Sequence, residues 1–586
     1  MSDPGVLMTQ YQRATRSTEV VSDRGVVSCS HIQEADAGVR MLEAGGNAVD
    51  AVVAAAFTGQ VVEPACCGLG GYGHMALFLA DTRQLVSVDH YVRAPAAARP
   101  DMFELDRSQP TTYYGWPTAV DRRNEWGAIS VAVPGAVAGL CAAHDRWGRL
   151  PLAQLLAPAI EAAEAGVRVS WDLVLAIVAR LKEIEALPNA AALLLRDGRP
   201  PKLTEDDVAS RGPDERIDTS ALAKTLREIA RHGAAGFYSG WVAEAIEREI
   251  KAGGGILTTD DLASYRPKIT LEPGAWYRGI RYSTGSDSVG YEALNILSCF
   301  DLAAYGPESS EYRHLMAEAM GHAYADNMHF YADPDFAPSP VNGLGSPEFA
   351  ASRAASIRLD RAAPRPIAPG DPWPYERELP ITEVIATRPS ASGLSGTSQM
   401  VAADGAGNVV ALITSVTSRF GSLVLVPDGG FFLNNAMRNF DPRPDRANCI
   451  APGKMPIFGV PAIAAEQNGV GVFGACGSDG YRITSGVLHA FVNHVDFGMR
   501  VQQALDRPRV HCQGEETFVD RRIPLAVQER LAELGHVVVQ QDETPAPINF
   551  SRVSAVARDP ATGELSAGSS PSWNTAAAGV MSAHGR

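Results

Sequence analysis

A proline-dense segment divides this chain into two parts of different character. Seven prolines fall between Pro364 and Pro389, and proline lacks the backbone N–H that helices and sheet ladders require. This density predicts a linker or an extended surface segment over residues 362–396. The sequence before it is rich in helical patterns, and after it short strand patterns follow one another from Gly396-Thr397 onward. The chain therefore reads as a helix-rich front, a proline-rich joint and a strand-rich back.

The spacing of apolar residues predicts the principal elements on each side of the joint. We expect two helices over residues 33–62, with Asn47 as the N-cap of the second, because its side chain can accept bonds from free helix N–H groups. Strand hairpins are expected at 74–88 and 398–416. Further helices are expected at 136–166 (split around 148–151), 173–187, 221–232, 309–324, 484–495 and 501–505, and short strands at 431–433, 462–465 and 470–473.

Charge and cysteine content exclude several functional classes. Lys and Arg number 51 against 67 Asp and Glu, a net charge of −16; such a surface repels phosphate backbones, so we expect no nucleic-acid partner. The eight cysteines form no CxxC pair and HExxH is absent, which favours buried thiols, no metal and no other cofactor. The N-terminus lacks the pattern of a signal peptide, and the apolar stretch 48–62 is too short and too polar to span a bilayer. We expect a cytoplasmic protein without a membrane partner.

Two glycine-rich runs each allow more than one interpretation. Residues 68–73 match the dinucleotide fingerprint GxGxxG, but a helix is expected before them and a strand after them, the reverse of what that fingerprint needs. A tight helix-to-strand turn is the better interpretation. Residues 474–480 do not form the GxSxG elbow of α/β-hydrolases, and no partner histidine can be placed for Cys476. Successive N–H groups of this run could instead hold a developing oxyanion.

Several sequence blocks stand together in an order that chance does not produce. They are EAGGNAVDA (43–51), VEP (62–64) with GLGG (68–71), VPGAVAGL (133–140), HDRWGRLP (144–151) with LAPAI (156–160), LNN (433–435) with Met437 and Phe440, GYRI (480–483), DRPR (506–509) and TAAAG (575–579). These blocks resemble the gamma-glutamyltransferase family of N-terminal nucleophile hydrolases along almost the whole chain.

That resemblance implies an α+β fold, a four-layer αββα sandwich made as one precursor that cleaves itself before Thr397. Residues 1–396 would become a large subunit and 397–586 a small one, together forming one globular fold. Whether two such heterodimers associate into a dimer is left open.

The residue types at Gly396-Thr397 suit this chemistry on their own. A threonine hydroxyl needs a base, and cutting the preceding peptide bond creates an α-amino group on the same residue, with an ordinary pKa of ~7.7–8.0. Gly396 leaves its carbonyl unshielded. By the resemblance, Ser415 stands where the family has a second threonine that hydrogen-bonds the nucleophile, and Asp479 and Gly480 stand where two glycines supply oxyanion-hole amides. The carboxylate of Asp479 must then point away from a developing anion.

The chain departs from the family pattern at the positions that hold the γ-glutamyl group. Tyr91 replaces an arginine that holds the α-carboxylate, and Arg93 lies two residues along, on the same face if the strand continues. The remaining departures implied by the resemblance are Thr417 for an asparagine, Ala436 and Asn439 for a glutamine and an aspartate, and Phe458-Gly459 for a serine pair. Arg419, Arg438 and Arg482 lie in the same loops, where they could meet a carboxylate or serve as structural ion pairs.

Together these departures predict a different acyl group on the same amide-cleaving centre. An ammonium in a desolvated pocket needs a counter-charge, and losing one hydrogen-bonded charge partner costs about 2–5 kcal/mol. We expect an amidohydrolase that acts on a small-molecule amide through an acyl-Thr397 intermediate, with an acyl group other than γ-glutamyl. Two alternatives stay open: a genuine gamma-glutamyl transferase or glutathione hydrolase, and an inactive, unprocessed relative that serves as a binding or structural protein.

Overall fold

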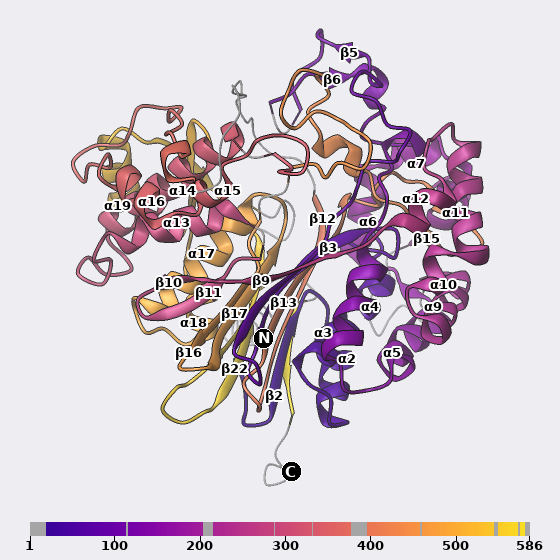
Figure 1. Cartoon of the computed structure of the whole chain (residues 1–586), viewed down its shortest axis with the longest axis horizontal. Helices are drawn as coiled ribbons and strands as arrows, with labels where there is room; N and C mark the ends of the chain where they lie inside the picture. The colour runs from indigo at the N-terminus through magenta and orange to yellow at the C-terminus, as the bar shows by residue number, and fades with distance from the viewer. Residues whose placement is uncertain are drawn as a thin grey trace, which may run out of the picture.

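The computed structural model describes residues 19–112, 115–202, 215–285, 287–330, 332–376, 395–457, 460–543, 549–571 and 575–580. Two seven-stranded sheets, in which neighbouring strands are antiparallel, lie at its centre (Figure 1). The first sheet has the order β23 (Ala576–Gly579), β2 (Gly25–Cys29), β12 (Ser395–Asp404), β13 (Val409–Ser418), β3 (Tyr72–Leu79), β4 (Gln84–His90) and β9 (Lys268–Glu272). The second has the order β1 (Val20–Ser22), β22 (Leu565–Ser569), β21 (Arg552–Arg558), β17 (Val470–Ser478), β16 (Ile463–Gln467), β11 (Ile280–Ser283) and β10 (Ala275–Tyr277).

The two sheets pack against each other through apolar side chains of their central strands. Val401 and Ile413 of the first sheet belong to the same buried cluster as Phe473 of the second. The first sheet is covered by α2 (Ile32–Glu43), α3 (Ala48–Val62) and α4 (Ala136–Trp147), of which α3 contacts β12 and β13, and α5 (Leu152–Ala165) packs on α3. On the other side of the molecule lie α13 (Ser288–Ser298), α14 (Ser310–Phe330), α17 (Arg482–Val495) and α18 (Val501–Asp506), and α17 contacts β17 and β21 (Figure 1).

Shorter elements surround these sheets. The helices are α6 (Trp171–Ala179), α7 (Leu181–Glu185), α8 (Pro188–Leu194), α9 (Ser220–His232), α10 (Ala235–Tyr238), α11 (Gly240–Ala252), α12 (Thr259–Ser264), α15 (Val341–Leu344), α16 (Pro347–Ala354) and α19 (Leu525–Glu533). The strands are β5 (Leu105–Asp106), β6 (Thr118–Ala119), β7 (Val167–Arg168), β8 (Arg216–Ile217), β14 (Leu425–Val426), β15 (Phe431–Phe432), β18 (Val510–Cys512), β19 (Glu516–Asp520) and β20 (Val537–Gln541). Short 3₁₀ turns occur at Val120–Arg122, Ala128–Ser130, Trp373–Tyr375 and Ala436–Asn439. Among the described residues, no helix combines the length and the apolarity needed to cross a membrane.

Local sequence signals predicted several elements correctly. The helix pair over 33–62 is confirmed as α2 and α3, and the Asn47 side chain accepts from the N–H groups of Val49 and Asp50 as an N-cap. The split of 136–166 into α4 and α5 and both hairpins are also confirmed.

Other boundaries differ for identifiable reasons. The helix expected over 173–187 is interrupted at Arg180, whose backbone φ of −120° is not helical, and becomes α6 and α7. The helix expected to end at residue 324 continues to Phe330. Its later polar residues are held by tertiary partners, because Asp326 pairs with Arg353 and Asn327 donates to Glu292.

Strands from before and after the proline-rich joint are interleaved. In the first sheet, β12 and β13 lie between β2 and β3. The last two residues of the predicted joint, 395 and 396, already belong to β12. The described part of the joint before them, residues 362–376, has only the turn at Trp373–Tyr375 as regular structure. It is fixed to α14, where Arg365 pairs with Glu318 at 2.5 Å. Residues 377–394 of the predicted linker lie outside the described residues.

Candidate active site

Thr397 lies near the start of β12, at an irregularity in the pairing of this strand with β13. Gly396 pairs with Thr417 and Thr397 pairs with Ser415, so Val416 is an extra residue on β13. A bulge of this kind bends a strand and changes the direction of its side chains. Both hydroxyl-bearing residues, Thr397 and Ser415, are only 5% exposed, so the bulge sets their hydroxyls in a site largely closed to bulk water.

The Ser415 hydroxyl contacts both groups that self-cleavage would involve. It donates to the carbonyl oxygen of Gly396 at 2.5 Å and accepts from the backbone N–H of Thr417 at 2.9 Å. Its oxygen lies 3.2 Å from the Thr397 hydroxyl oxygen. Because a serine hydroxyl carries one proton, and that proton points to Gly396, the Thr397 hydroxyl is the donor in this last contact. Ser415 thus accepts a hydrogen bond from the Thr397 hydroxyl and donates one to the Gly396 carbonyl oxygen, which polarises that carbonyl.

The glycine run 68–73 packs directly behind this hairpin. A Cβ atom on Gly71 would lie 2.4 Å from the Ser415 carbonyl oxygen, and one on Gly70 would lie 2.4 Å from the carbonyl oxygen of Phe432. The run follows α3, and its last two residues, Tyr72 and Gly73, begin β3. The interpretation as a tight helix-to-strand turn is therefore confirmed, and these glycines permit a close approach of two backbones.

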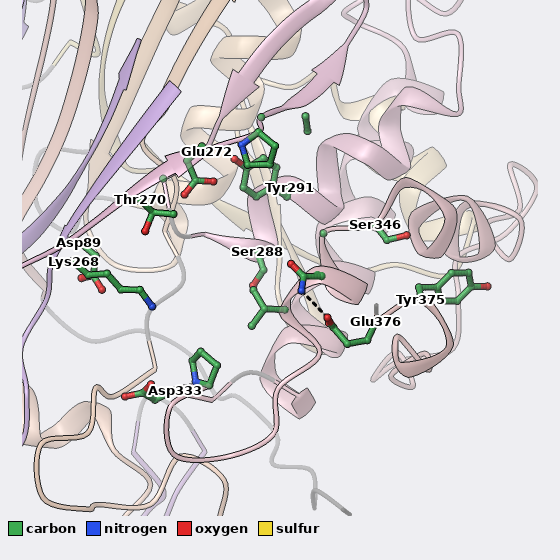
Figure 2. A pocket seen from close by; sticks show the side chains of 18 of the residues that line it. Asp89, Lys268, Thr270, Glu272, Ser288, Tyr291, Asp333, Ser346, Tyr375 and Glu376 are labelled. Carbon is green, nitrogen blue, oxygen red and sulfur yellow. Dashed lines mark hydrogen bonds between the residues drawn. The ribbon is translucent and has the colours of Figure 1, made fainter. Parts of the chain in front are cut away.

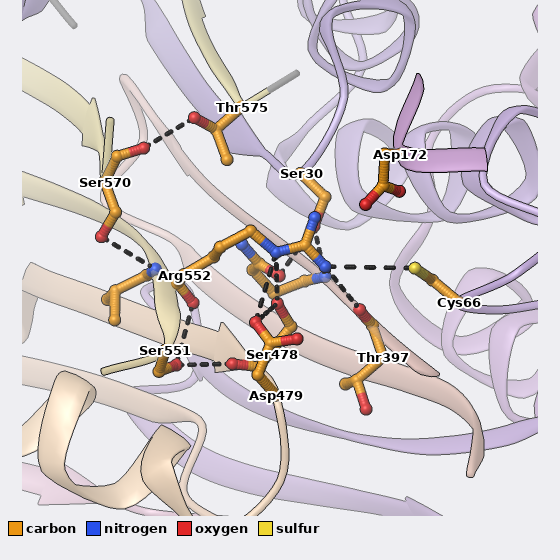
Figure 3. Close-up of polar contacts among 12 residues, drawn as sticks. Ser30, Cys66, Asp172, Thr397, Ser478, Asp479, Ser551, Arg552, Ser570 and Thr575 are labelled. Atoms are coloured by element: carbon orange, nitrogen blue, oxygen red, sulfur yellow. Dashed lines mark hydrogen bonds and ion pairs between the residues drawn. The ribbon is translucent and has the colours of Figure 1, made fainter. Parts of the chain in front are cut away.

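Asp479 and Gly480 form the turn between β17 and α17. Both have positive φ, +90° and +70°, a region that non-glycine residues seldom occupy. The Asp479 carboxylate lies 3.3 Å from the Arg552 Nε atom and 3.1 Å from the Ser478 hydroxyl. The carboxylate that replaces a glycine in the resemblance is therefore bound by a guanidinium (Figure 3).

Arg552 is a buried residue next to Thr397 that sequence reasoning did not include. It comes from β21, is 5% exposed, and donates from Nη2 to the carbonyl oxygen of Thr397 at 3.3 Å. Its other neighbours include Glu63 at 3.7 Å and the Cys66 sulfur at 4.0 Å. Burial alone would lower the pKa of Arg552, but Asp479, Cys66 and Glu63 together hold it well above the ordinary value.

Buried ionisable groups extend beyond Arg552. Burial raises the pKa of the Cys66 thiol to about 12, although Arg419 donates to its sulfur at 2.7 Å. Burial and the neighbouring Glu63 raise the pKa of Glu34 well above its ordinary value. Arg419 also lies 3.7 Å from Asp172, so this arginine is committed to a buried thiol and a carboxylate.

Two of the predicted specificity residues contact each other directly. The Asn439 side-chain amide donates to the Tyr91 hydroxyl at 2.7 Å, and both residues are 3% exposed. The Tyr91 ring packs edge-on to Tyr72 at 4.5 Å between centroids, and the Tyr72 hydroxyl lies 2.8 Å from that of Thr417. Ala436 belongs to the same buried cluster as the two tyrosines. A continuous series of contacts therefore leads from Thr397 through Ser415, Thr417, Tyr72 and Tyr91 to Asn439.

The other predicted residues lie apart from this set or outside the described residues. The strand alternation assumed for Arg93 is wrong, because β4 ends at His90. The Arg93 guanidinium lies 3.5 Å from Asp89, and Arg93 is among the residues that line a cavity of about 1020 Å³. Lys268 and Asp333 also line this cavity (Figure 2). Neither Thr397 nor Tyr91 is among the described residues that line this cavity.

Two further arginines have structural partners. Arg438 donates to the Ser418 hydroxyl at 2.6 Å. Arg482 donates to the Asn549 carbonyl oxygen, also at 2.6 Å, and lies over the Phe518 ring. Phe458 and Gly459 fall outside the described residues.

One group of side chains has the composition of a metal site. His314, Glu318 and His536 are buried with their ligand atoms close together. However, Arg365 pairs with Glu318, and the two imidazoles lie 2.7 Å apart, nitrogen to nitrogen. A guanidinium thus already supplies the positive charge that neutralises this carboxylate.

Comparison with known proteins places these features in context. Residues 35–580 match the model of the family described as Gamma-glutamyltranspeptidase. The chain is 34% identical over 541 residues to the Acylase ACY 1 proenzyme of Pseudomonas sp. (strain SE83), covering 90% of this chain and 89% of that protein. It is 31% identical over 570 residues to the glutathione hydrolase proenzyme of Bacillus subtilis (strain 168), covering 96% and 92%. The crystal structure of cephalosporin acylase from Bacillus halodurans superposes with a TM-score of 0.82 at 28% identity, covering 97% and 98%.

Proposed function

The chain belongs to the gamma-glutamyltranspeptidase family, and from that premise we propose that it cleaves itself before Thr397 and then hydrolyses amides through an acyl-Thr397 intermediate. The relatives named as acylase and glutathione hydrolase proenzymes support a self-processing amidohydrolase. We also assign the fold to the four-layer αββα type, since helices contact the outer faces of two packed sheets.

The proposed self-cleavage follows from the contacts of Ser415. The Thr397 Oγ1 atom attacks the carbonyl carbon of Gly396, and Ser415 takes the Thr397 proton as it gives its own proton to the carbonyl oxygen. That proton then passes from the new hydroxyl to the nitrogen of Thr397 as the C–N bond breaks and the Gly396 carbonyl re-forms, which leaves an ester between Gly396 and the threonine oxygen. Water then hydrolyses the ester. The products are a carboxylate on Gly396 and a free α-amine on Thr397, which can serve as base for the hydroxyl of the same residue.

The hydrogen bond between Asn439 and Tyr91 is the observation that carries the acyl-group assignment. By the family resemblance, these two positions hold the ammonium and the carboxylate of a γ-glutamyl group with an aspartate and an arginine. Here they form a neutral, buried pair that offers no formal charge to either group. Burying an ammonium without a counter-charge is costly.

The carboxylates of Asp89 and Asp479, next to this region, already form ion pairs with arginines. Asp89 accepts from the Tyr91 N–H and pairs with Arg93, and Asp479 pairs with Arg552. We infer that the acyl group carries no α-ammonium, which is compatible with the acylases among the relatives.

A matched pair of substrates tests this assignment. Glutaryl-p-nitroanilide and γ-glutamyl-p-nitroanilide differ only in the α-ammonium, and phenylacetyl-p-nitroanilide adds an uncharged, aromatic acyl group. We expect kcat/KM to be at least tenfold higher for glutaryl or phenylacetyl anilide than for γ-glutamyl anilide. A γ-glutamyl value of ~10⁴ M⁻¹s⁻¹ or more, within the usual enzyme range, that also exceeds the other two would replace the proposal with a glutathione hydrolase, the function named for the Bacillus subtilis relative.

Processing is tested separately with the nucleophile variant. Purified wild-type protein should give two bands on a denaturing gel, and N-terminal sequencing of the smaller band should begin Thr-Ser-Gln-Met. The Thr397→Ala variant should remain a single chain of 62.2 kDa, because it lacks the attacking oxygen. Two fragments from this variant would rule out Thr397, and a single wild-type band would favour an inactive, structural relative.

A further inference from the structure

We propose that Arg552 is a positioning residue that holds the oxyanion turn at Asp479-Gly480 against the Thr397 nucleophile, with Asp479 and Arg552 acting as one unit. This inference rests on the proposed function, because it assigns a role within the same site. It adds a residue from β21, a strand that the sequence motifs of the site do not include.

Strand register places Arg552 next to the turn. In the antiparallel pair of β17 and β21, Arg552 stands directly opposite Ser478, the residue before Asp479. Its Nε atom donates to the Ser478 hydroxyl at 3.0 Å and lies 3.3 Å from the Asp479 carboxylate. The same guanidinium therefore contacts both the last residue of β17, Ser478, and the first residue of the turn, Asp479.

The other edge of the guanidinium contacts β12, the strand that carries Thr397. Nη2 donates to the carbonyl oxygen of Thr397 at 3.3 Å (Figure 3). Thr397 belongs to β12 in the first sheet, whereas Arg552 and the turn belong to the second. One planar group with donors in fixed directions thus sets the distance between nucleophile and turn across the interface of the two sheets.

The backbone of Asp479 explains why the turn needs such support. A φ of +90° is costly for a residue with a side chain, and such conformations persist only where surrounding contacts impose them. The bonds from Arg552 and Ser478 to the carboxylate are contacts of that kind. They also pair the negative charge of this carboxylate with a cation, at a position where an unpaired carboxylate would repel a developing oxyanion. The aspartate in place of a glycine and the buried arginine therefore compensate for each other.

The experiment is a double-mutant cycle with a matched control. The variants are Arg552→Gln, Asp479→Gly and their combination, together with Arg552→Lys. Arg558→Gln is the control, because Arg558 lies on the same strand but donates to the Asp404 carbonyl oxygen at its far end. Each protein is assayed for self-cleavage on denaturing gels, for thermal unfolding, and for kcat and KM on whichever of the three p-nitroanilides the wild type turns over fastest.

We expect Arg552→Gln to lower kcat by about 10²-fold or more, the effect of disturbing an oxyanion site, with KM changed less than threefold. Arg558→Gln should stay within threefold of wild type. The double variant should recover at least tenfold of the kcat lost in Arg552→Gln, because glycine needs no carboxylate partner. Such non-additivity is the signature of a coupled pair.

The contrary outcomes are distinguishable. A wild-type chain that neither cleaves itself nor turns over an amide overturns both the proposed function and this inference. An active wild type with an unchanged kcat in Arg552→Gln, or with a raised KM only, overturns the inference alone, as does a double variant no better than Arg552→Gln. If Arg552→Gln does not fold, the test moves to Arg552→Lys, which keeps the charge without the fork: a tenfold or greater loss of kcat supports the inference, and a wild-type kcat overturns it.

Discussion

At the scale of single residues, the Ser415 hydroxyl has the largest expected effect after that of Thr397, the proposed nucleophile. It contacts the Thr397 hydroxyl and the Gly396 carbonyl oxygen at the same time. Ser415→Ala should slow self-cleavage by ~10–1000-fold, the range typical of losing one preorganised polar partner. Ser415→Thr keeps the hydroxyl and should be tolerated. The measurement is the time course of band conversion on denaturing gels, and an unchanged rate in Ser415→Ala would refute the role assigned to this contact.

The Tyr91–Asn439 pair gives a second prediction at this scale. Because the two side chains touch at 2.7 Å, Tyr91→Arg or Asn439→Asp alone buries an unpaired charge, which is strongly destabilising. The double variant restores an ion pair and the family's partners for a γ-glutamyl group. We expect both single variants to have lower thermal unfolding temperatures than the double variant. We also expect the double variant to raise kcat/KM for γ-glutamyl-p-nitroanilide at least tenfold. If the three variants are equally stable, the two side chains are not coupled.

Sequence reasoning predicted site residues that lie close to one another in the chain. The family resemblance, followed by a count along one hairpin, places Ser415 beside Thr397, and the structure pairs the two residues on neighbouring strands. Arg552 could not be found in this way, because it lies 155 residues from Thr397 in the chain. A signal was nevertheless present: an arginine at the start of the strand RVSAVAR and an aspartate in a glycine turn are each unexplained alone. Two such misfits of opposite charge are candidates for a buried pair.

At the scale of elements, the glycine turn before β3 fixes the position of β13. A Cβ on Gly71 would lie 2.4 Å from the Ser415 carbonyl oxygen, so Gly71→Ala must displace the strand that carries Ser415. Overpacking of this kind costs about 1–3 kcal/mol. We expect Gly71→Ala to slow self-cleavage at least tenfold and to lower the thermal unfolding temperature.

Gly68→Ala in the same turn is the control for that prediction. Its Cβ would meet its nearest neighbours at 3.7 Å, an ordinary contact, so cleavage should stay within threefold of wild type. Equal effects of the two substitutions would show that the turn as a whole, rather than its contact with Ser415, limits the reaction.

Element order in the sheets was beyond the reach of local patterns. Capping and periodicity predicted α3 and the hairpin of β12 and β13, since these signals lie within a few residues. The pairing of β12 with β2 joins residues about 370 positions apart, and the sequence carries no turn signal for it. Alternating apolar residues define which face of a strand is buried, but they do not choose its neighbour.

At the scale of the whole molecule, the interleaved sheets determine what cleavage can do to the assembly. If the chain is cut between Gly396 and Thr397, β12 and β13 belong to one fragment, while β2 and β3 on either side of them belong to the other. The second sheet is divided in the same way, with β1, β10 and β11 on the larger fragment. Separating the fragments would break both sheets and expose the buried cluster between them.

We therefore expect the two fragments to stay together after cleavage and to unfold together. Cleaved wild-type protein and the uncleaved Thr397→Ala variant should elute at the same volume in size-exclusion chromatography, whatever their oligomeric state. Thermal unfolding of the cleaved protein should show one transition, because neither fragment retains either of the two seven-stranded sheets complete. The fragments should separate only in denaturant, since each lost strand pairing leaves buried backbone groups without partners. Elution of the fragments as separate folded species, or two well-resolved transitions, would contradict this account and would mean that each fragment forms a core of its own.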